Sequence, residues 1–299
     1  MVVLRDVTLR DGLQDEEPIP TEAKLALYEA LVTAGIPELE VASFVRPDRV
    51  PAMADAEAMC SATEGAPVTR WGLVLNRRGA ERALAAGLRH LQYVISVSES
   101  HQQENAGQTV GAALATTADL VALAAESGAV VDLTLSTSFG CPFEGPVDPD
   151  AVVALAESAL GVGVRCIDLA DTIGTAIPSE VRSLVRRVQA LSDAPIGVHV
   201  HDTRGLGVAN ALAAIEEGAA RIDGAVGGLG GCPFAPGATG NLPLEDLVHV
   251  LEAMGEPTGV DLDALLRASH LADELTGHAV TGHVAVAGPR FAQLASPSR

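Results

Sequence analysis

Short β-branched runs alternate with Ala- and Leu-rich segments along most of the chain. The intervening segments repeat apolar residues with a period of 3.6, as in Thr21 to Ala34, where Thr21 is the expected N-cap, and Pro178 to Leu191, so they are predicted helices. The runs are predicted strands, and they cover Val2 to Leu9, Leu39 to Phe44, Thr69 to Leu75, Leu91 to Val97, Val130 to Ser136, Arg165 to Ala170, Ile196 to His201 and Arg221 to Val226.

Eight alternations of strand and helix within about 230 to 250 residues are typical of a (β/α)8 TIM barrel, an α/β fold. A doubly wound sheet shares the local pattern, but the barrel is our prediction. We assign residues 1–260 to a catalytic barrel. Residues 261–299 are expected to form a short C-terminal helical extension or cap of the same domain.

Composition narrows the classes of function. Hydrophobic residues make up 48% of the 299 residues and aromatic residues 3%, which indicates a globular protein with an aliphatic core. A formal net charge of -20 argues against nucleic acid, whose phosphates are bound by Lys and Arg. Lys24 is the only lysine, so an anionic substrate has to be held by arginines, helix N-termini or a metal.

The cysteines indicate neither a disulfide framework nor a zinc ribbon, because they are widely spaced and form no Cys-x-x-Cys motif. They are Cys60, Cys141, Cys166 and Cys232. No apolar run reaches the ~18 residues of a membrane span, and Met1 leads into a strand rather than a signal sequence. We therefore expect a cytoplasmic protein that contacts no membrane.

Two histidines end the seventh predicted strand. His199 and His201 point to the same face because side chains alternate along a strand. Two imidazoles on one face make half a metal site, and the carboxyl end of a barrel strand is where barrel enzymes place their chemistry. Asp11 follows the first strand, and closure of the barrel brings it toward the two histidines.

Further charged residues lie in or just after the predicted strands. Arg10 lies beside Asp11, and Glu40 is predicted to face the barrel axis, where a carboxylate needs a partner such as Arg10. Asp168 is expected to point inward near Glu40. For Asp171, a site residue and a helix N-cap are equally compatible with the sequence.

A glycine-rich segment, residues 227–241, follows the last strand and is predicted to be a lid over the barrel mouth. Cys232 is its candidate reactive thiol. Asn241 ends the segment, either as the N-cap of the next helix or as a further metal ligand. Asp11, His199, His201 and Asn241 together form a mixed nitrogen and oxygen set that suits Mg²⁺ or Mn²⁺ acting as a Lewis acid.

The ordered set of motifs resembles the 3-hydroxy-3-methylglutaryl-CoA lyase family, within the metal-dependent barrel lyases and synthases. The match runs in order from Val2 to about Leu275. It rests on Arg10-Asp11-Gly12-Leu13-Gln14, Glu40 with Ser43-Phe44-Val45, Gly140-Cys141-Pro142-Phe143-Glu144-Gly145, Asp171-Thr172-Ile173-Gly174, His199-Val200-His201-Asp202-Thr203, and Gly228 to Ala235 with Gly237 to Asn241.

The resemblance implies a retro-Claisen cleavage of 3-hydroxy-3-methylglutaryl-CoA to acetyl-CoA and acetoacetate. Arg10 would stabilise the enolate oxygen, Glu40 would hold Arg10, and Cys232 would transfer a proton to the enolate. Asp11, His199 or a water on the cation remain open as the group that takes the hydroxyl proton.

The resemblance also implies a ligand set and partners. The implied cation ligands are Asp11, His199, His201 and Asn241. Asp171 joins the catalytic candidates, and the candidate cofactor-binding residues are Gln14, Ser43 and Thr172. An acyl-CoA substrate and a homo-oligomer are expected, with a dimer as the favoured state.

Two departures from the family leave the substrate open. Glu17 stands where members often carry lysine, and Asp168 stands where they carry serine, so both are expected to add negative charge near the mouth. A related 3-hydroxyacyl-CoA therefore remains a second substrate. Two further hypotheses stay open, namely a Claisen-condensing synthase, like isopropylmalate synthase, and a catalytically silent barrel.

Overall fold

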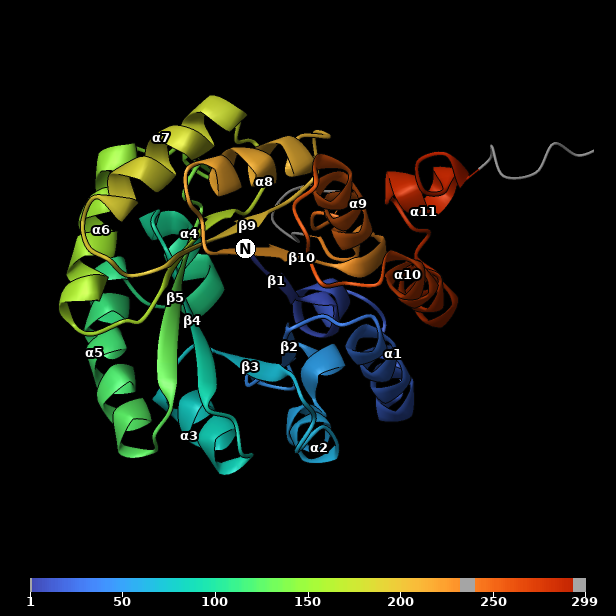
Figure 1. The fold of residues 1–299 in the computed structure, drawn as a ribbon. Helices are drawn as coiled ribbons and strands as arrows, with labels where there is room; N and C mark the ends of the chain where they lie inside the picture. Colours follow the sequence, from blue (N-terminus) through green and yellow to red (C-terminus); the bar gives the residue numbers. More distant parts are fainter. Residues whose placement is uncertain (1, 232–239, 293–299) are drawn as a thin grey trace, which may run out of the picture.

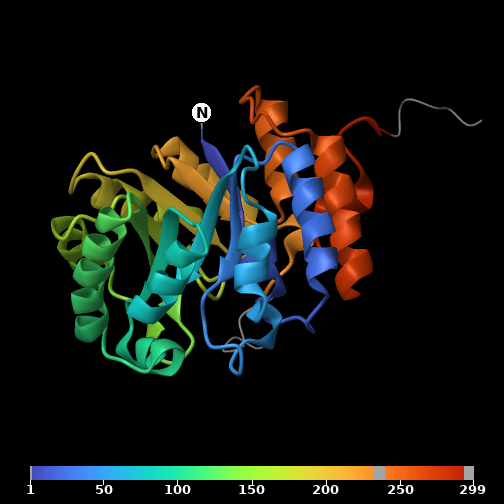
Figure 2. The same cartoon turned by 90° about the horizontal axis from the view of Figure 1, so that it is seen from below.

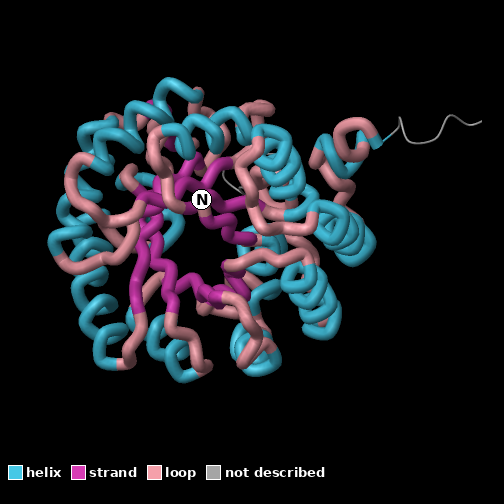
Figure 3. Tube along the Cα trace, in the orientation of Figure 1, coloured by secondary structure: helices cyan, strands magenta, loops and turns pink. Residues whose placement is uncertain are grey.

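The chain folds into a closed barrel of eight parallel strands, in the order β1-β10-β9-β8-β5-β4-β3-β2, inside a ring of helices (Figures 1 and 3). The computed structural model describes residues 2–231 and 240–292. It confirms the predicted TIM barrel. The barrel strands are β1 Val3–Asp6, β2 Glu38–Ser43, β3 Thr69–Val74, β4 His90–Ser96, β5 Val130–Ser136, β8 Ile167–Asp171, β9 Ile196–Val200 and β10 Arg221–Gly224.

Helices connect successive strands, and the β5–β8 connection also carries a small hairpin of β6 (Gly140–Cys141) and β7 (Gly145–Pro146). Two 3-10 turns, η2 (Pro51–Met53) and η3 (Val226–Gly228), lie between elements. The helices are α1 Thr21–Thr33, α2 Ala56–Ala62, α3 Arg77–Ala85, α4 Glu99–Ala106, α5 Val110–Glu126, α6 Pro149–Gly161, α7 Pro178–Gln189, α8 Gly207–Glu216, α9 Leu244–Met254, α10 Leu262–Thr276 and α11 His283–Ala287.

The first strand is shorter than predicted. β1 ends at Asp6, and Thr8–Gly12 form a single π-helical turn, η1, in which the Gly12 N–H donates to the Val7 carbonyl (3.1 Å). Asp6 holds the start of this turn, because its carboxylate accepts from both the N–H (2.9 Å) and the hydroxyl (2.8 Å) of Thr8. Such turns frequently occur at functional sites.

Thr21 is not the N-cap of α1, which corrects the prediction. Pro20 occupies that position, and the Thr21 hydroxyl donates instead to Asp55 (2.8 Å). Lys24 contacts the same carboxylate. Its Nζ donates to Asp55 Oδ1 (2.5 Å) and the Ala52 carbonyl (2.5 Å), and the side chain is buried. The sole lysine therefore fastens α1 to the segment before α2.

The core has two parts of opposite character. Aliphatic side chains fill the layer between strands and helices. The barrel interior instead holds buried charges, and the Trp71 ring lies 4.8 Å from the guanidinium carbon of Arg221 and 5.2 Å from that of Arg5. Barrels usually fill this space with branched aliphatic residues. Gly197 leaves room for Asp168, because any side chain there would overlap its carboxylate.

The C-terminal helices cover one side of the barrel. α10 runs beside α1 (Figures 1 and 2), and the Asp261 N–H before it donates to the Ala34 carbonyl (2.8 Å). The chain then returns to α9, where Asp246 accepts from the N–H groups of His283 (2.8 Å) and Val284 (2.7 Å). The extension is thus bonded to the end of α1 and to α9.

The same extension holds the root of the glycine-rich segment. Glu245 Oε1 accepts from the Gly227 N–H (3.0 Å) and the Ser269 hydroxyl (3.0 Å), and the Thr281 N–H donates to the Gly227 carbonyl (2.9 Å). Gly227 adopts φ 67°, a left-handed conformation that glycine accepts readily. Burial raises the pKa of the Glu245 carboxyl to about 7.

Within residues 2–231 and 240–292, no single helix has the length and apolar character to cross a membrane. The helices α4 and α5 reach that length and apolar character only when taken together, and they are bent by 59°. Cys60, Cys141 and Cys166 are buried free thiols.

The raised pKa of Glu245 predicts a pH dependence of stability. In the unfolded chain the carboxyl ionises near the usual glutamate pKa of 4.5, whereas the folded one keeps its proton until about 7. The free energy of unfolding therefore falls, relative to Glu245→Gln, as the pH rises from 4.5 to 7, by about 3 kcal/mol at most.

Urea unfolding of both chains across this range measures the difference. Glu256→Gln, at an exposed position, is the control and should follow the native chain. A constant difference between native and Glu245→Gln would contradict the assignment.

Candidate active site

Two imidazoles face each other at the carboxyl end of β9. His199 lies in the strand and His201 just after it, and their Nε2 atoms are 3.3 Å apart. Both side chains are buried. The predicted common face of the pair is confirmed.

Asp11 reaches the same point from η1. Its Oδ2 lies 3.5 Å from Nε2 of His201 and 3.9 Å from Nε2 of His199. Burial raises the pKa of the Asp11 carboxyl, but the adjoining guanidinium of Arg10 and the two imidazoles outweigh burial and hold the pKa well below its usual range. Asp11 is thus an ionised carboxylate beside two ring nitrogens.

Asn241 completes the group. It forms a β-bridge with His201, and its Nδ2 donates to Asp11 Oδ2 (2.8 Å) and the Leu229 carbonyl (2.9 Å). Pro243, not Asn241, precedes α9 at the N-cap, so the capping alternative is wrong. The buried Oδ1 of Asn241 has no hydrogen-bond partner among the described residues. In this structure the NH₂ group faces Asp11, so Oδ1 would reach a cation beside Asp11 only after a half-turn of the amide.

The other ring nitrogens show why the Nε2 atoms suit a cation. His199 Nδ1 donates to Asp223 Oδ2 (3.2 Å), and His201 Nδ1 donates to the Thr172 carbonyl (2.8 Å). With both Nδ1 atoms protonated, the Nε2 lone pairs are available as ligands. The carboxylate, the two imidazoles and the unpartnered amide oxygen therefore fit a divalent cation.

Arg10 lies beside this group and is held from β2. Its Nε donates to Glu40 Oε2 (2.5 Å), and Glu40 is fully buried. The predicted pairing of Arg10 with Glu40 is present. The guanidinium is thus fixed next to Asp11 as a preorganised hydrogen-bond donor.

Asp171 and Thr172 shape the loop after β8. The Asp171 carboxylate accepts from the N–H groups of Thr175 (2.9 Å) and Ala176 (2.9 Å), whereas Ile177 precedes α7, so Asp171 is not that helix's N-cap. Burial raises the pKa of Asp171. The Thr172 hydroxyl accepts from the Thr137 N–H (2.7 Å), which orders the carbonyl that His201 uses.

Ser43 is buried at the end of β2, and Gln14 is half-buried just beyond η1. Both therefore lie at the carboxyl ends of strands that adjoin the site. Cys232 lies outside the described residues.

Asp168 does not add charge to the mouth, which corrects the expectation. It is fully buried inside the barrel and pairs with Arg221 (2.6 Å) and Arg5 (3.4 Å). Glu17 is exposed. Asp132, Cys166 and Asp168 form a second cluster of ligand-type atoms, but the Arg221 Nη2 lies among them, 2.8 Å from Asp132.

Sequence reasoning missed Asp223 and Arg5. They are register partners of each other, and Asp223 is also the register partner of His199. The available signal was a charged residue at an inward strand position in each of two predicted strands that the barrel makes neighbours.

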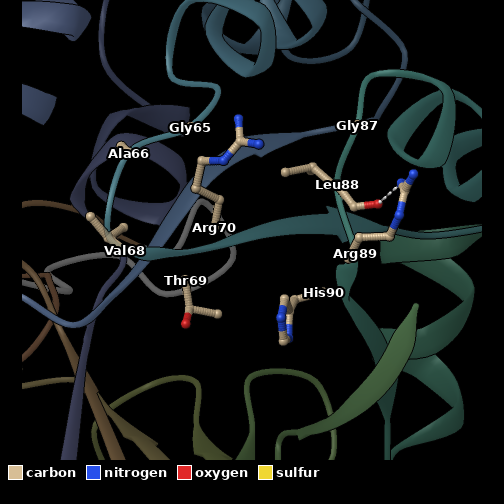
Figure 4. A pocket seen from close by; sticks show the side chains of 9 residues that line it. All are labelled: Gly65, Ala66, Val68, Thr69, Arg70, Gly87, Leu88, Arg89 and His90. Atoms are coloured by element: carbon tan, nitrogen blue, oxygen red, sulfur yellow. Dashed lines mark hydrogen bonds between the residues drawn. The ribbon is translucent and has the colours of Figure 1, made fainter. Parts of the chain in front are cut away.

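A separate pocket lies at the opposite end of the barrel (Figure 4). It has a volume of about 280 Å³ and lies where β3 and β4 begin, between Thr69, Arg70, Arg89 and His90. Arg70 Nη1 already donates to the Cys60 carbonyl (2.7 Å), and Arg89 Nη1 donates to the Leu88 carbonyl (2.7 Å). The candidate site is therefore distinct from this pocket.

Fold and site together define a TIM-barrel enzyme with a candidate centre for a divalent cation. The HMGL-like family model matches residues 1–272. (R)-citramalyl-CoA lyase of Chloroflexus aurantiacus is 38% identical over 99% of this chain and 97% of its own length. A hydroxymethylglutaryl-CoA lyase of Bacillus subtilis is 37% identical over 92% of this chain and 93% of its own.

A solved structure is similar over the whole fold. The HMG-CoA lyase from Acinetobacter baumannii, in complex with coenzyme A and 3-methylmalate, has a TM-score of 0.94 and 39% identity, and the alignment covers 100% of this chain and 98% of that one. The chain belongs to the HMGL-like family and is a lyase of that family.

The geometry predicts that Asn241→Ala weakens Mn²⁺ binding about tenfold or more, because it removes the candidate oxygen ligand. Titration followed by electron paramagnetic resonance measures the affinity. Asn210→Ala is the matched control: Asn210 is also buried with an unpartnered Oδ1 in the described part of the chain, but its Nδ2 bonds Ala176 away from the cluster. Equal affinities for the native chain and Asn241→Ala would exclude Asn241 as a ligand.

Proposed function

We propose that the chain is a divalent-cation-dependent carbon–carbon lyase that cleaves 3-hydroxy-3-methylglutaryl-CoA to acetyl-CoA and acetoacetate. One observation carries the proposal: the Nε2 atoms of His199 and His201 and Asp11 Oδ2 converge beside the fixed guanidinium of Arg10. Mg²⁺ or Mn²⁺ is the proposed ion, held by these three residues and Asn241. The proposed substrate is accordingly an acyl-CoA with a 3-hydroxyl group.

The reaction breaks the bond between C2 and C3 of the acyl group. The hydroxyl proton leaves, the C3 oxygen becomes a carbonyl, and the electron pair of the broken bond forms the enolate of acetyl-CoA. A bound divalent cation supplies Lewis acidity that eases loss of the hydroxyl proton.

The chain's own residues stabilise and then quench the enolate. Arg10 donates to the developing enolate oxygen, and its pairing with Glu40 holds it ready without reorganisation. We assign the proton that converts the enolate carbon to a methyl group to the Cys232 thiol.

(R)-Citramalyl-CoA is the second candidate substrate, favoured by similarity to citramalyl-CoA lyase over nearly the full length of both chains. Its acyl group is one methylene shorter, and the same bond cleavage yields acetyl-CoA and pyruvate. The bound coenzyme A and 3-methylmalate in the Acinetobacter structure fit a small hydroxy-diacid thioester. A hydrophobic pocket discriminates one methylene by only about 10- to 200-fold, so both thioesters have to be assayed.

The assay measures acetoacetate and pyruvate release from the two thioesters with Mg²⁺ or Mn²⁺ and after chelation. We expect cleavage that needs the cation. Loss of the Arg10 donor in Arg10→Met should lower kcat by roughly 10² to 10³. Arg77→Met is the matched control, because Arg77 forms an exposed ion pair with Glu81 (2.9 Å).

Cys232→Ser should also lose most of its activity if the thiol supplies the proton. Cleavage that survives chelation would contradict the role of the cation. Failure to cleave either thioester would contradict the proposal, and condensation of acetyl-CoA with a 2-ketoacid would then indicate a synthase.

A further inference from the structure

A chain of hydrogen bonds in the barrel interior connects an arginine and an aspartate to His199. Arg5 binds Asp223 through two parallel bonds, from Nε to Oδ1 (2.9 Å) and from Nη2 to Oδ2 (2.5 Å). The same Oδ2 accepts from Nδ1 of His199 (3.2 Å). All three residues are buried, and they occupy one row across β1, β10 and β9.

Arg5 itself cannot turn away. Its Nη1 donates to Gln92 Oε1 (2.6 Å), and its Nη2 lies 3.4 Å from Asp168 Oδ2. Gln92 and Arg221 also donate to Asp168 Oδ2, at 3.0 Å and 2.6 Å. The fork that faces Asp223 is therefore fixed by contacts from two further strands, β4 and β8.

This arrangement determines which ring nitrogen of His199 carries the proton. A guanidinium only donates, so Asp223 has to present oxygens to Arg5, and an ionised carboxylate has only acceptors left for His199. His199 must then donate from Nδ1, so Nε2 is the ring nitrogen that faces Asp11 and His201 and can give its lone pair to a cation.

We propose that Asp223 and Arg5 are positioning residues that fix His199 as its Nδ1–H tautomer and thereby set the cation affinity of the site. The inference deepens the proposed function, since it rests on the same cation site. Neither residue touches the reacting atoms.

Asp223→Asn tests the inference. The amide keeps one oxygen for three donors, namely Nε and Nη2 of Arg5 and Nδ1 of His199, so Arg5 and His199 compete for it and the bond that holds the Nδ1 proton is weakened. Mn²⁺ affinity, measured by paramagnetic resonance without substrate, should fall about 10- to 100-fold.

Asp132→Asn is the matched control. Asp132 is equally buried in the barrel and pairs with Arg165 (2.7 Å) and Arg221 (2.8 Å), but no bond joins it to His199 in the described structure. Its Mn²⁺ affinity should equal that of the native chain. An equal loss in Asp132→Asn would show that the ion pairs only support the fold, and native affinity in folded Asp223→Asn would overturn the proposal.

The double variant Arg5→Met with Asp223→Asn separates the two roles. Without the guanidinium, the amide oxygen is free to accept from His199 Nδ1, so Mn²⁺ should bind more tightly than to Asp223→Asn alone. No recovery would show that Arg5 does not direct the amide, which contradicts its assigned role.

A measurement on the unaltered chain covers the case in which Asp223→Asn does not fold. Ring ¹⁵N shifts of the cation-free protein, assigned by difference from His199→Asn, should show that His199 carries a proton at Nδ1. An Nε2–H tautomer would overturn the proposal. These readouts need no substrate, so failure of thioester cleavage alone would contradict the proposed function and leave the inference standing.

Discussion

The pairing of β1 with β10 closes the barrel, and the site depends on that closure. The register runs from Val3 opposite Arg221 to Asp6 opposite Gly224, and it brings Asp11 to Asn241, 230 positions along the chain. Parallel strands deliver their carboxyl ends to one rim. Four candidate ligands from both ends of the sequence therefore meet without a dedicated connecting segment.

The charged barrel interior is costly in free energy, because each buried ion loses its hydration. Only ion pairs with good geometry offset that desolvation cost. Here the pairs are made: Arg5 and Arg221 neutralise Asp168, and Arg5 also binds Asp223. Aliphatic residues would fill the same space at lower cost. Ion pairs differ from aliphatic contacts because their hydrogen bonds are directional. Here the Arg5–Asp223 pair orients the imidazole of His199.

Much of the architecture could be predicted from the sequence, because strand alternation and helical periodicity are local. The same local rule placed His199 and His201 on one face, and the cost of an unpaired buried carboxylate identified Arg10 as the partner of Glu40. The π-helical turn at Thr8–Gly12 could not be predicted, since it depends on Asp6 and Gly12 in three dimensions.

The register of the barrel strands could not be predicted from the sequence either. Asp223 becomes the partner of His199, and Arg5 that of Asp223, only once β10 lies between β9 and β1 in register. Asp168 points inward as predicted, but the expectation that it adds charge near the mouth was wrong, because its depth in the barrel follows from its place opposite Gly197. The assigned role of Cys232 stays a prediction, since the described residues do not include it.

Lys24 is the only lysine of the chain, and its ammonium group is enclosed by the Asp55 carboxylate and the Ala52 carbonyl. An ammonium group that is buried and ion-paired is a poor nucleophile, since it must lose both its proton and its partner before it reacts. Acylating reagents, amine cross-linkers and enzymatic lysine acetylation or ubiquitination thus find no accessible side-chain amine on the folded protein. An enzyme proposed to work among reactive thioesters therefore offers them little to acylate.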